Sequence, residues 1–179
     1  MTHSSKQLSY TNGQLTVLVV LRMLIGWHLL YEGITKLWSA NWSAAGYLND
    51  SAGIFAGMFK AMAGSPGLMD VVNFLNVWGL IAVGLGLILG LMTRWAIIGG
   101  IVLLSLYYLS HPPLIGVQYA LPSEGSYLWV NKNLIEVFAL AVLLVFPTSH
   151  LIGLERFFRR EKTAPQSAPA VRERAKATV

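Results

Sequence analysis

The chain contains no cysteine among its 179 residues. Disulfide bonds, iron–sulfur clusters, thiolate metal sites and thiol–disulfide redox chemistry are therefore excluded. If the protein handles electrons, a bound organic molecule or a partner protein has to carry them.

Charged side chains are also scarce, at 12 % of the chain against 55 % hydrophobic residues. A soluble domain carries about 25 % charged residues, so this composition predicts an integral membrane protein. Four apolar stretches are candidates for the spans of about 20 residues that a membrane requires. They lie at residues 15–38, 71–91, 95–110 and 134–146. The last reaches the required length only if its polar start at 130–133 lies at the membrane interface.

These stretches predict an all-α fold, an integral membrane antiparallel four-helix bundle formed by residues 15–153 after a short cytoplasmic segment, 1–14. In the first outer loop, apolar residues of the segment 54–62 follow one another at three- and four-residue spacing. This spacing predicts a short interfacial helix that lies on the membrane or caps the bundle. Residues 154–179 form a basic tail with little to bury, which we expect to be disordered.

The basic residues predict how the chain crosses the membrane. Seven of them follow the last apolar stretch, and Arg94 lies in the short connection between the second and third stretches. By the positive-inside rule both termini are then cytoplasmic, in a multi-pass protein of the cytoplasmic (inner) membrane. The tail charge is suited to anionic lipid head groups, and no nucleic acid partner is expected.

Four ionisable residues share one face of the first apolar stretch. At about 100° per residue they fit within an arc of about 120°. They are Arg22, His28, Glu32 and Lys36. A charge at the bilayer centre costs at least about 2.5 kcal/mol and is tolerated mainly where it faces protein or a water-filled cavity. This face is therefore predicted to point toward other helices or a partner.

Polar residues of the other stretches enter the membrane at matching depth, in its outer half. The third stretch ends outside near Tyr107 and His111, and the fourth begins outside with Lys132 and, one turn deeper, Glu136. We therefore predict one outer-half pocket between the first and fourth helices. Its ligand-binding residues are Arg22, Lys36, Tyr107, His111, Lys132 and Glu136, and its catalytic residues are His28 and Glu32.

The same residues also have a structural interpretation. Glu32 and Lys36 are four residues apart and can pair on a helix, as can Lys132 and Glu136. The two lysines can also extend to the lipid head groups. The deep charges Arg22, Glu32 and Glu136 favour a ligand pocket over these explanations.

A quinone fits such a pocket better than haem or a metal ion. His28 lies about 15 Å deeper than the helix end near His111, so the two histidines cannot hold one haem iron. Tight metal-ligand spacing is confined to His28 and Glu32, so no metal is expected. For a quinone, His28 and Glu32 would move protons and basic residues would bind its carbonyl oxygens. Aromatic rings would flank it, and the candidates are Trp27, Trp78, Tyr107 and Tyr108. A water-filled cavity for a small anion or sugar would use the same groups.

Several short motifs lie between residues 15 and 146. They are Arg22-x-x-x-Gly26 with Tyr31-Glu32-Gly33-x-x-Lys36-Leu37, the stretch Ser51-Ala52-Gly53-Ile54-Phe55-Ala56-Gly57-Met58-Phe59-Lys60, Gly84-x-x-Leu87-Ile88-Leu89-Gly90-Leu91-x-Thr93-Arg94, and Asn131-Lys132-Asn133-Leu134-Ile135-Glu136. In this order they resemble the first helix, the first outer loop, the second-to-third-helix connection and the start of the fourth helix of the DoxX/DoxD family of four-helix bacterial membrane proteins.

The resemblance implies a redox function. DoxD-type members are linked to the membrane part of a thiosulfate:quinone oxidoreductase, and DoxX-type members to membrane-anchored redox complexes. It therefore implies a quinone-dependent oxidoreductase subunit whose partner is a second redox subunit or another copy of the chain. The matched motif positions imply pocket roles for Arg22, Glu32, Lys36, Lys132 and Glu136. No motif for thiosulfate is found. The competing interpretation is a non-redox small-solute transporter or a membrane scaffold for a partner protein.

Overall fold

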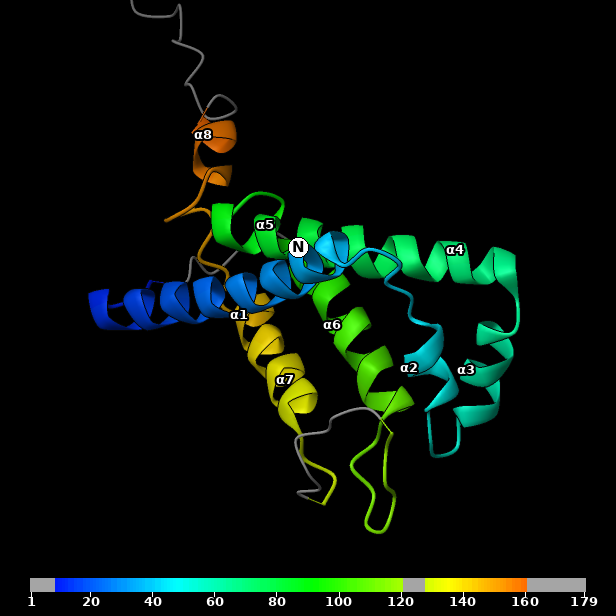
Figure 1. Ribbon diagram of the computed structural model, residues 1–179. Helices are drawn as coiled ribbons and strands as arrows, with labels where there is room; N and C mark the ends of the chain where they lie inside the picture. Colours follow the sequence, from blue (N-terminus) through cyan, green and yellow to red (C-terminus); the bar gives the residue numbers. More distant parts are fainter. Residues whose placement is uncertain (1–8, 121–127, 161–179) are drawn as a thin grey trace, which may run out of the picture.

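A computed structural model describes residues 9–120 and 128–160 (Figure 1). These residues form helices and no β-strand, as the composition predicts. In chain order the helices are α1 (Asn12–Trp38), α2 (Ala45–Asn49), α3 (Ala56–Ala63), α4 (Pro66–Phe74), the π-helical turn η1 (Leu75–Gly79), α5 (Leu80–Leu89), α6 (Thr93–Ser110), α7 (Lys132–Val145) and α8 (Glu155–Arg160).

Helix α1 begins at a capping box and continues through the whole first apolar stretch. The Thr11 hydroxyl accepts from the backbone N–H of Gln14, and the Gln14 side chain accepts from the backbone N–H of Thr11. This reciprocal pairing satisfies two backbone donors that a helix start leaves without partners. The helix ends at Trp38, where the predicted stretch also ends.

The second apolar stretch is one continuous helical rod interrupted by a π-helical turn. Helices α4 and α5 join through η1, so the rod runs over Pro66–Leu89. Pro66 lies in the first turn of α4, where its missing N–H costs nothing. The rod ends at Gly90, whose φ of 64° is left-handed and accessible to glycine without strain. The sequence predicts this span over residues 71–91, so the rod begins five residues earlier than predicted, and the π-helical turn is not predicted.

Three described helical segments are long and apolar enough to cross a membrane, namely α1, the Pro66–Leu89 rod and α6. Helix α7 has 14 residues. Its start is fixed by Asn131, whose side chain accepts from the backbone N–H of Leu134 at 3.1 Å. The polar residues at the start of the fourth stretch thus form a helix cap.

The long helices pack around a common apolar core. Helix α1 packs against α5, α6 against both α5 and α7, and α7 also contacts α1. Figure 1 shows α1 and α5 side by side, with α6 and α7 running obliquely to them. The α1–α5 contact is close because Gly84 has no side chain. A Cβ there would lie 2.6 Å from the backbone N of Leu30 and 2.7 Å from the carbonyl O of Gly26.

The segment that the sequence predicts as the first outer loop, residues 39–70 and called the outer loop below, forms a small second core beside the long helices. Its buried residues are Ala44, Leu48, Phe59 and Met69. Helix α3 covers the predicted helical segment 54–62 from Ala56 onward and packs against α2 and α4. The backbone N–H of Ala44 donates to the Asn73 side chain at 2.9 Å and so ties this loop to α4.

The segment after α7 differs from the prediction of a disordered tail from residue 154. Residues 155–160 form α8, and the chain just before it docks on the end of α5. The N–H groups of Leu154 and Glu155 donate to the carbonyl oxygens of Leu89 and Gly90 at 2.9 and 3.1 Å. These bonds satisfy acceptors that the end of α5 leaves open. The remainder of the predicted tail, 161–179, lies outside the described residues.

Candidate functional site

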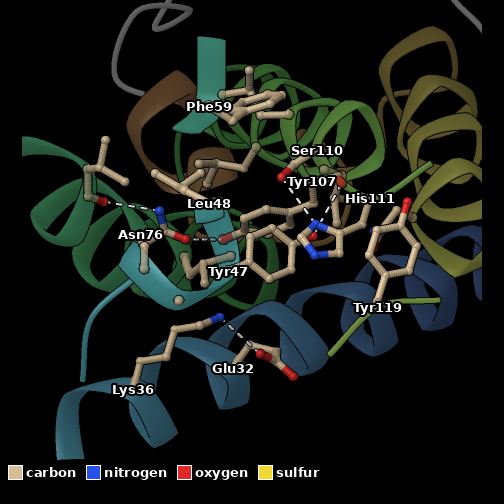
Figure 2. Close-up of a pocket in the computed structure, with 18 of the residues that line it drawn as sticks. Glu32, Lys36, Tyr47, Leu48, Phe59, Asn76, Tyr107, Ser110, His111 and Tyr119 are labelled. Atoms are coloured by element: carbon tan, nitrogen blue, oxygen red, sulfur yellow. Dashed lines mark hydrogen bonds and ion pairs between the residues drawn. The ribbon is translucent and has the colours of Figure 1, made fainter. Parts of the chain in front are cut away.

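A cavity of about 970 Å³ lies between α1, the outer loop that carries α2 and α3, the end of α6 and the start of α7 (Figure 2). This volume is in the range of about 300–1,000 Å³ that is usual for small-molecule sites. Much of its wall is apolar, and polar groups project from several elements. Its polar and aromatic lining includes His28, Glu32, Lys36, Trp42, Tyr47, Asn76, Tyr107, Ser110, His111, Tyr119, Asn131, Lys132 and Asn133.

Helix α1 contributes an ion pair to the cavity. Lys36 Nζ lies 3.0 Å from Glu32 Oε2, one helical turn away. The same ammonium lies 5.7 Å from the ring centroid of Trp42 and 5.8 Å from that of Tyr107. A cation within about 6 Å of an aromatic ring is attracted to the π-electron face. The Lys36 ammonium is thus held inside the cavity, with its side chain only 17 % exposed.

A second polar pair links α1 to α7. His28 Nδ1 and Glu136 Oε1 are joined by a short hydrogen bond. Glu136 does not line the cavity but reaches it through His28, whereas Lys132 lines it directly. The predicted convergence of the first and fourth helices is therefore present at this level.

The π-helical turn η1 places Asn76 on the opposite wall. Asn76 Nδ2 donates to the carbonyl O of Val72 at 3.0 Å, and Asn76 Oδ1 accepts from the Tyr107 hydroxyl at 2.5 Å. Such turns leave the regular hydrogen-bond ladder of a helix and occur frequently at functional sites. Figure 2 shows the Asn76–Tyr107 hydrogen bond in the lining beside the Glu32–Lys36 pair.

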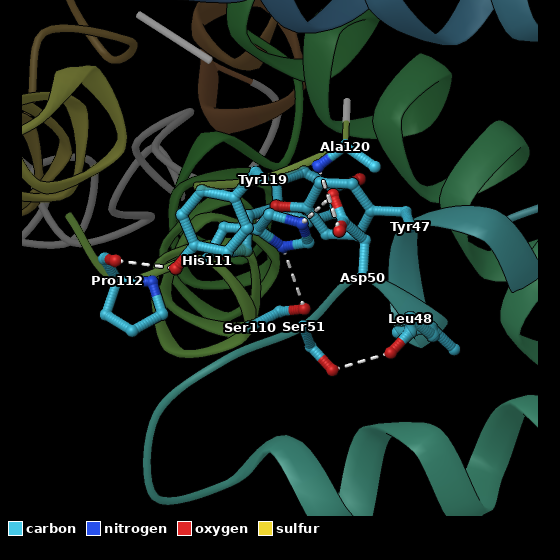
Figure 3. Close-up of polar contacts among 10 residues, drawn as sticks. Tyr47, Leu48, Asp50, Ser51, Ser110, His111, Pro112, Tyr119 and Ala120 are labelled. Carbon is cyan, nitrogen blue, oxygen red and sulfur yellow. Dashed lines mark hydrogen bonds and ion pairs between the residues drawn. The ribbon is translucent and has the colours of Figure 1, made fainter. Parts of the chain in front are cut away.

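One end of the cavity, where α6 ends, is formed by an aromatic stack. The His111 ring is stacked on Tyr47, with 3.8 Å between centroids, and Tyr119 covers its other face at 4.5 Å (Figure 3). The Tyr47 hydroxyl donates to the backbone O of Tyr107 at 3.3 Å. Burial raises the pKa of Tyr47, so this phenol is neutral at physiological pH. Burial lowers the pKa of His111, and the nearby Asp50 carboxylate only partly offsets this.

The structure brings most of the predicted site residues together. The cavity is lined by His28, Glu32, Lys36, Tyr107, His111 and Lys132, and Glu136 contacts it through His28. The paired arrangement of Glu32 with Lys36 also agrees with the structural interpretation of that pair.

Arg22 is not part of this cavity. It is 2 % exposed, and its guanidinium donates from Nη1 to the Thr148 hydroxyl at 3.1 Å and from Nη2 to the carbonyl O of Ile152 at 2.8 Å. Although it shares a helix face with His28, it lies six residues, or about 9 Å, deeper along the axis. A common face does not give a common depth, and the chain around Thr148 supplies its partners.

Most of the aromatic residues predicted to flank a quinone lie outside the cavity lining. Trp27 and Trp78 are 61 % and 49 % exposed and do not line the cavity. The Tyr108 hydroxyl donates to the backbone O of Trp129 at 2.8 Å, away from the cavity lining. Of the four predicted rings, Tyr107 alone is in the lining.

Sequence reasoning missed the roles of Tyr47, Asp50 and Tyr119. These residues lie in loops or short helices, where no periodicity reveals which way a side chain points. Within residues 9–120 and 128–160, no group of three or more histidine, aspartate or glutamate side chains is placed to hold a metal ion.

Comparison with known proteins places the chain in a family. The family model described as DoxX matches residues 17–111, which is more than half of the chain. No curated protein and no solved structure gave a match. The matched range includes α1 from Val17 onward, the outer loop, the rod and α6, and ends at His111.

Proposed function

Because the chain belongs to the DoxX family, whose members are membrane proteins, we propose that it is the membrane subunit of a quinone-linked redox system. In this proposal α1, the Pro66–Leu89 rod, α6 and α7 form an antiparallel four-helix bundle in the cytoplasmic membrane. Both termini are cytoplasmic, and the cavity lies in the outer half. The three apolar helices and the basic residues near α8 support this orientation.

The observation that carries the proposal is a cavity of about 970 Å³ with an apolar wall and a few placed polar groups. A quinone presents a flat apolar ring with two carbonyl oxygens, so it needs such a mixture. Apolar wall residues include Leu29, Phe59, Met62 and Leu104. The partly buried ammonium of Lys36 is a donor suited to a carbonyl oxygen.

The charges around the cavity favour a neutral ligand over an anion. Lys36 is paired with Glu32, and His28 is hydrogen-bonded to Glu136. The Lys36 ammonium is therefore already compensated by a carboxylate, which favours a neutral ligand such as a quinone over an anion.

When bound, a quinone supplies two-electron chemistry that is coupled to proton transfer. In this chain Lys36 would hold a carbonyl oxygen, and Glu32 would be available to accept or return a proton beside it. The hydrogen bond between His28 Nδ1 and Glu136 Oε1 links this wall of the cavity to α7. Because the chain contains no cysteine, electrons would come from or go to a second redox subunit or another copy of the chain. Membrane lipid surrounds the bundle, and no nucleic acid is involved.

The test is to purify the protein from membranes, extract its lipids and measure quinone per protein by liquid chromatography and mass spectrometry. Titration with decylubiquinone, followed by tryptophan fluorescence, then gives an affinity. We expect Lys36→Met to weaken binding by about tenfold, which corresponds to one hydrogen bond. The matched control is Lys60→Met on α3, because Lys60 is exposed and outside the cavity lining.

A kinetic measurement tests the proposed role of Glu32 in proton transfer. In membranes that contain the partner system, Glu32→Gln should slow reduction of added quinone, whereas Asp70→Asn on the exposed surface of α4 should not. Absence of bound quinone, together with uptake of a labelled solute that Glu32→Gln abolishes, would replace this proposal by the transporter interpretation.

A further inference from the structure

The Asp50 carboxylate connects two segments at the outer end of the cavity. Oδ1 accepts from the backbone N–H of Ala120 at 3.0 Å, and Oδ2 lies 3.7 Å from His111 Nε2 (Figure 3). Asp50 follows α2, whereas His111 and Ala120 bound the segment that leaves α6. One side chain of the first outer loop thus contacts both ends of the segment 111–120.

His111 is enclosed on several sides. Its ring lies between Tyr47 and Tyr119, and Nδ1 is 3.1 Å from the Ser110 hydroxyl. Nε2 is buried and has no hydrogen-bond partner among the described residues. The distance of 3.7 Å to Asp50 is too long for a hydrogen bond but short enough for strong attraction between charges. The titratable side chains that contact the ring are therefore Asp50, Tyr47 and Tyr119.

The segment 111–120 forms part of the cavity wall. Its lining residues include His111, Val117, Gln118 and Tyr119. Additional bonds fix its start, because the backbone N–H of Ala52 donates to the carbonyl O of Ser110 at 3.0 Å. At its far end, the bond from Ala120 to Asp50 links this wall to the first outer loop. Asp50 itself does not line the cavity.

We propose that Asp50 is a positioning residue of the ligand cavity, which holds His111 and the segment 111–120 against α2 so that the Tyr47–His111–Tyr119 stack remains a wall of the site. It acts through Ala120 by hydrogen bonding and through His111 by its charge. The role of the wall in quinone binding rests on the proposed function, but the contact between Asp50 and His111 does not.

Substitution by asparagine separates the two interactions. In the Asp50→Asn variant the amide oxygen still accepts from Ala120, but the negative charge beside His111 is lost. The chain has four histidines, so His111 can be assigned in an NMR titration by the loss of its signal in His111→Gln. Because the carboxylate favours the charged imidazole, Asp50→Asn should lower the pKa of His111 further. Asp70→Asn, on the exposed surface of α4, is the matched control and should leave it unchanged.

A binding measurement tests the consequence for the cavity. Asp50→Ala should weaken decylubiquinone binding by about tenfold, and Asp50→Asn by less, because it retains the bond to Ala120. If Asp50→Ala fails to fold, the asparagine variant alone decides the result. An unchanged His111 titration and unchanged affinity in Asp50→Asn would overturn the proposal. If the wild-type protein does not bind decylubiquinone, the proposed function fails, whereas a shifted His111 titration would still support the positioning role of Asp50.

Discussion

Replacing Arg22 by methionine should destabilise the protein without weakening ligand binding. The substitution removes the hydrogen bonds from the guanidinium to Thr148 and Ile152. Hydrogen bonds from a charged donor contribute about 1.5–3 kcal/mol each, and two of them about 3–6 kcal/mol. Because burying the charge also has a cost that methionine avoids, we expect a net loss of about 3 kcal/mol. For a chain of this size that lowers Tm by about 6–12 °C.

Thermal unfolding in nanodiscs, followed by tryptophan fluorescence, measures this loss. Arg22→Lys retains the charge but not the two-pronged donor, and should lie between wild type and Arg22→Met. Arg94→Met is the matched control, because Arg94 is exposed in the first turn of α6. Decylubiquinone affinity should be unchanged in all three variants, since neither arginine lines the cavity.

The opposite pattern would refute this reasoning. If Arg22→Met left Tm within about 1 °C of wild type but reduced quinone affinity tenfold or more, Arg22 would be a ligand-binding residue as the sequence pattern predicted. The hydrogen bonds from Arg22 to Thr148 and Ile152 would then contribute little to the free energy of unfolding.

Three further outcomes are expected. Gly84→Ala should lower Tm by several degrees, because its Cβ would meet backbone atoms of α1, whereas Gly57→Ala, with open space around it, should not; thermal unfolding compares them. Ile115→Cys and Phe157→Cys, both at exposed positions of a chain without native cysteine, should label from opposite sides of sealed vesicles, and labelling from one side would refute the proposed topology. Because burial lowers the pKa of His111, its stabilising contribution is complete above the unfolded value of about 6.5 and is lost as the pH falls through the folded pKa. His111→Gln should therefore lose less stability between about pH 7 and pH 5 than wild type, as unfolding at each pH will show.

The long helices were predictable because length and apolar character determine them. The first stretch was predicted to end at Trp38, and α1 ends there. Short elements were not predictable in the same way. Helix α8 lies in a basic segment with little to bury, and its start depends on bonds from Leu154 and Glu155 to the end of α5. Such long-range contacts leave no local pattern in the sequence.

The candidate site was predictable only where helical geometry connects residues. His28, Glu32 and Lys36 follow four-residue steps, so their common wall could be deduced from spacing. Arg22 satisfies the same angular rule, yet it lies too deep to reach the cavity. Asp50 carries no such signal, because it lies in a loop and its contacts with residues 111 and 120 depend on the tertiary fold.

The π-helical turn η1 changes which side chains of the Pro66–Leu89 rod face its neighbours, the outer loop and the other long helices. Met69 and Leu87 are 18 residues apart, which is about five full turns of an unbroken α-helix, so they would point in the same direction. Met69 is buried in the outer-loop core and Leu87 in the core of the long helices. The additional residue in the turn rotates one half of the rod relative to the other by about 100°. Deleting one residue from Leu75–Gly79 would rotate the two halves back into line. Either the outer-loop core or the contact with α1 would then lose the side chains that pack in it.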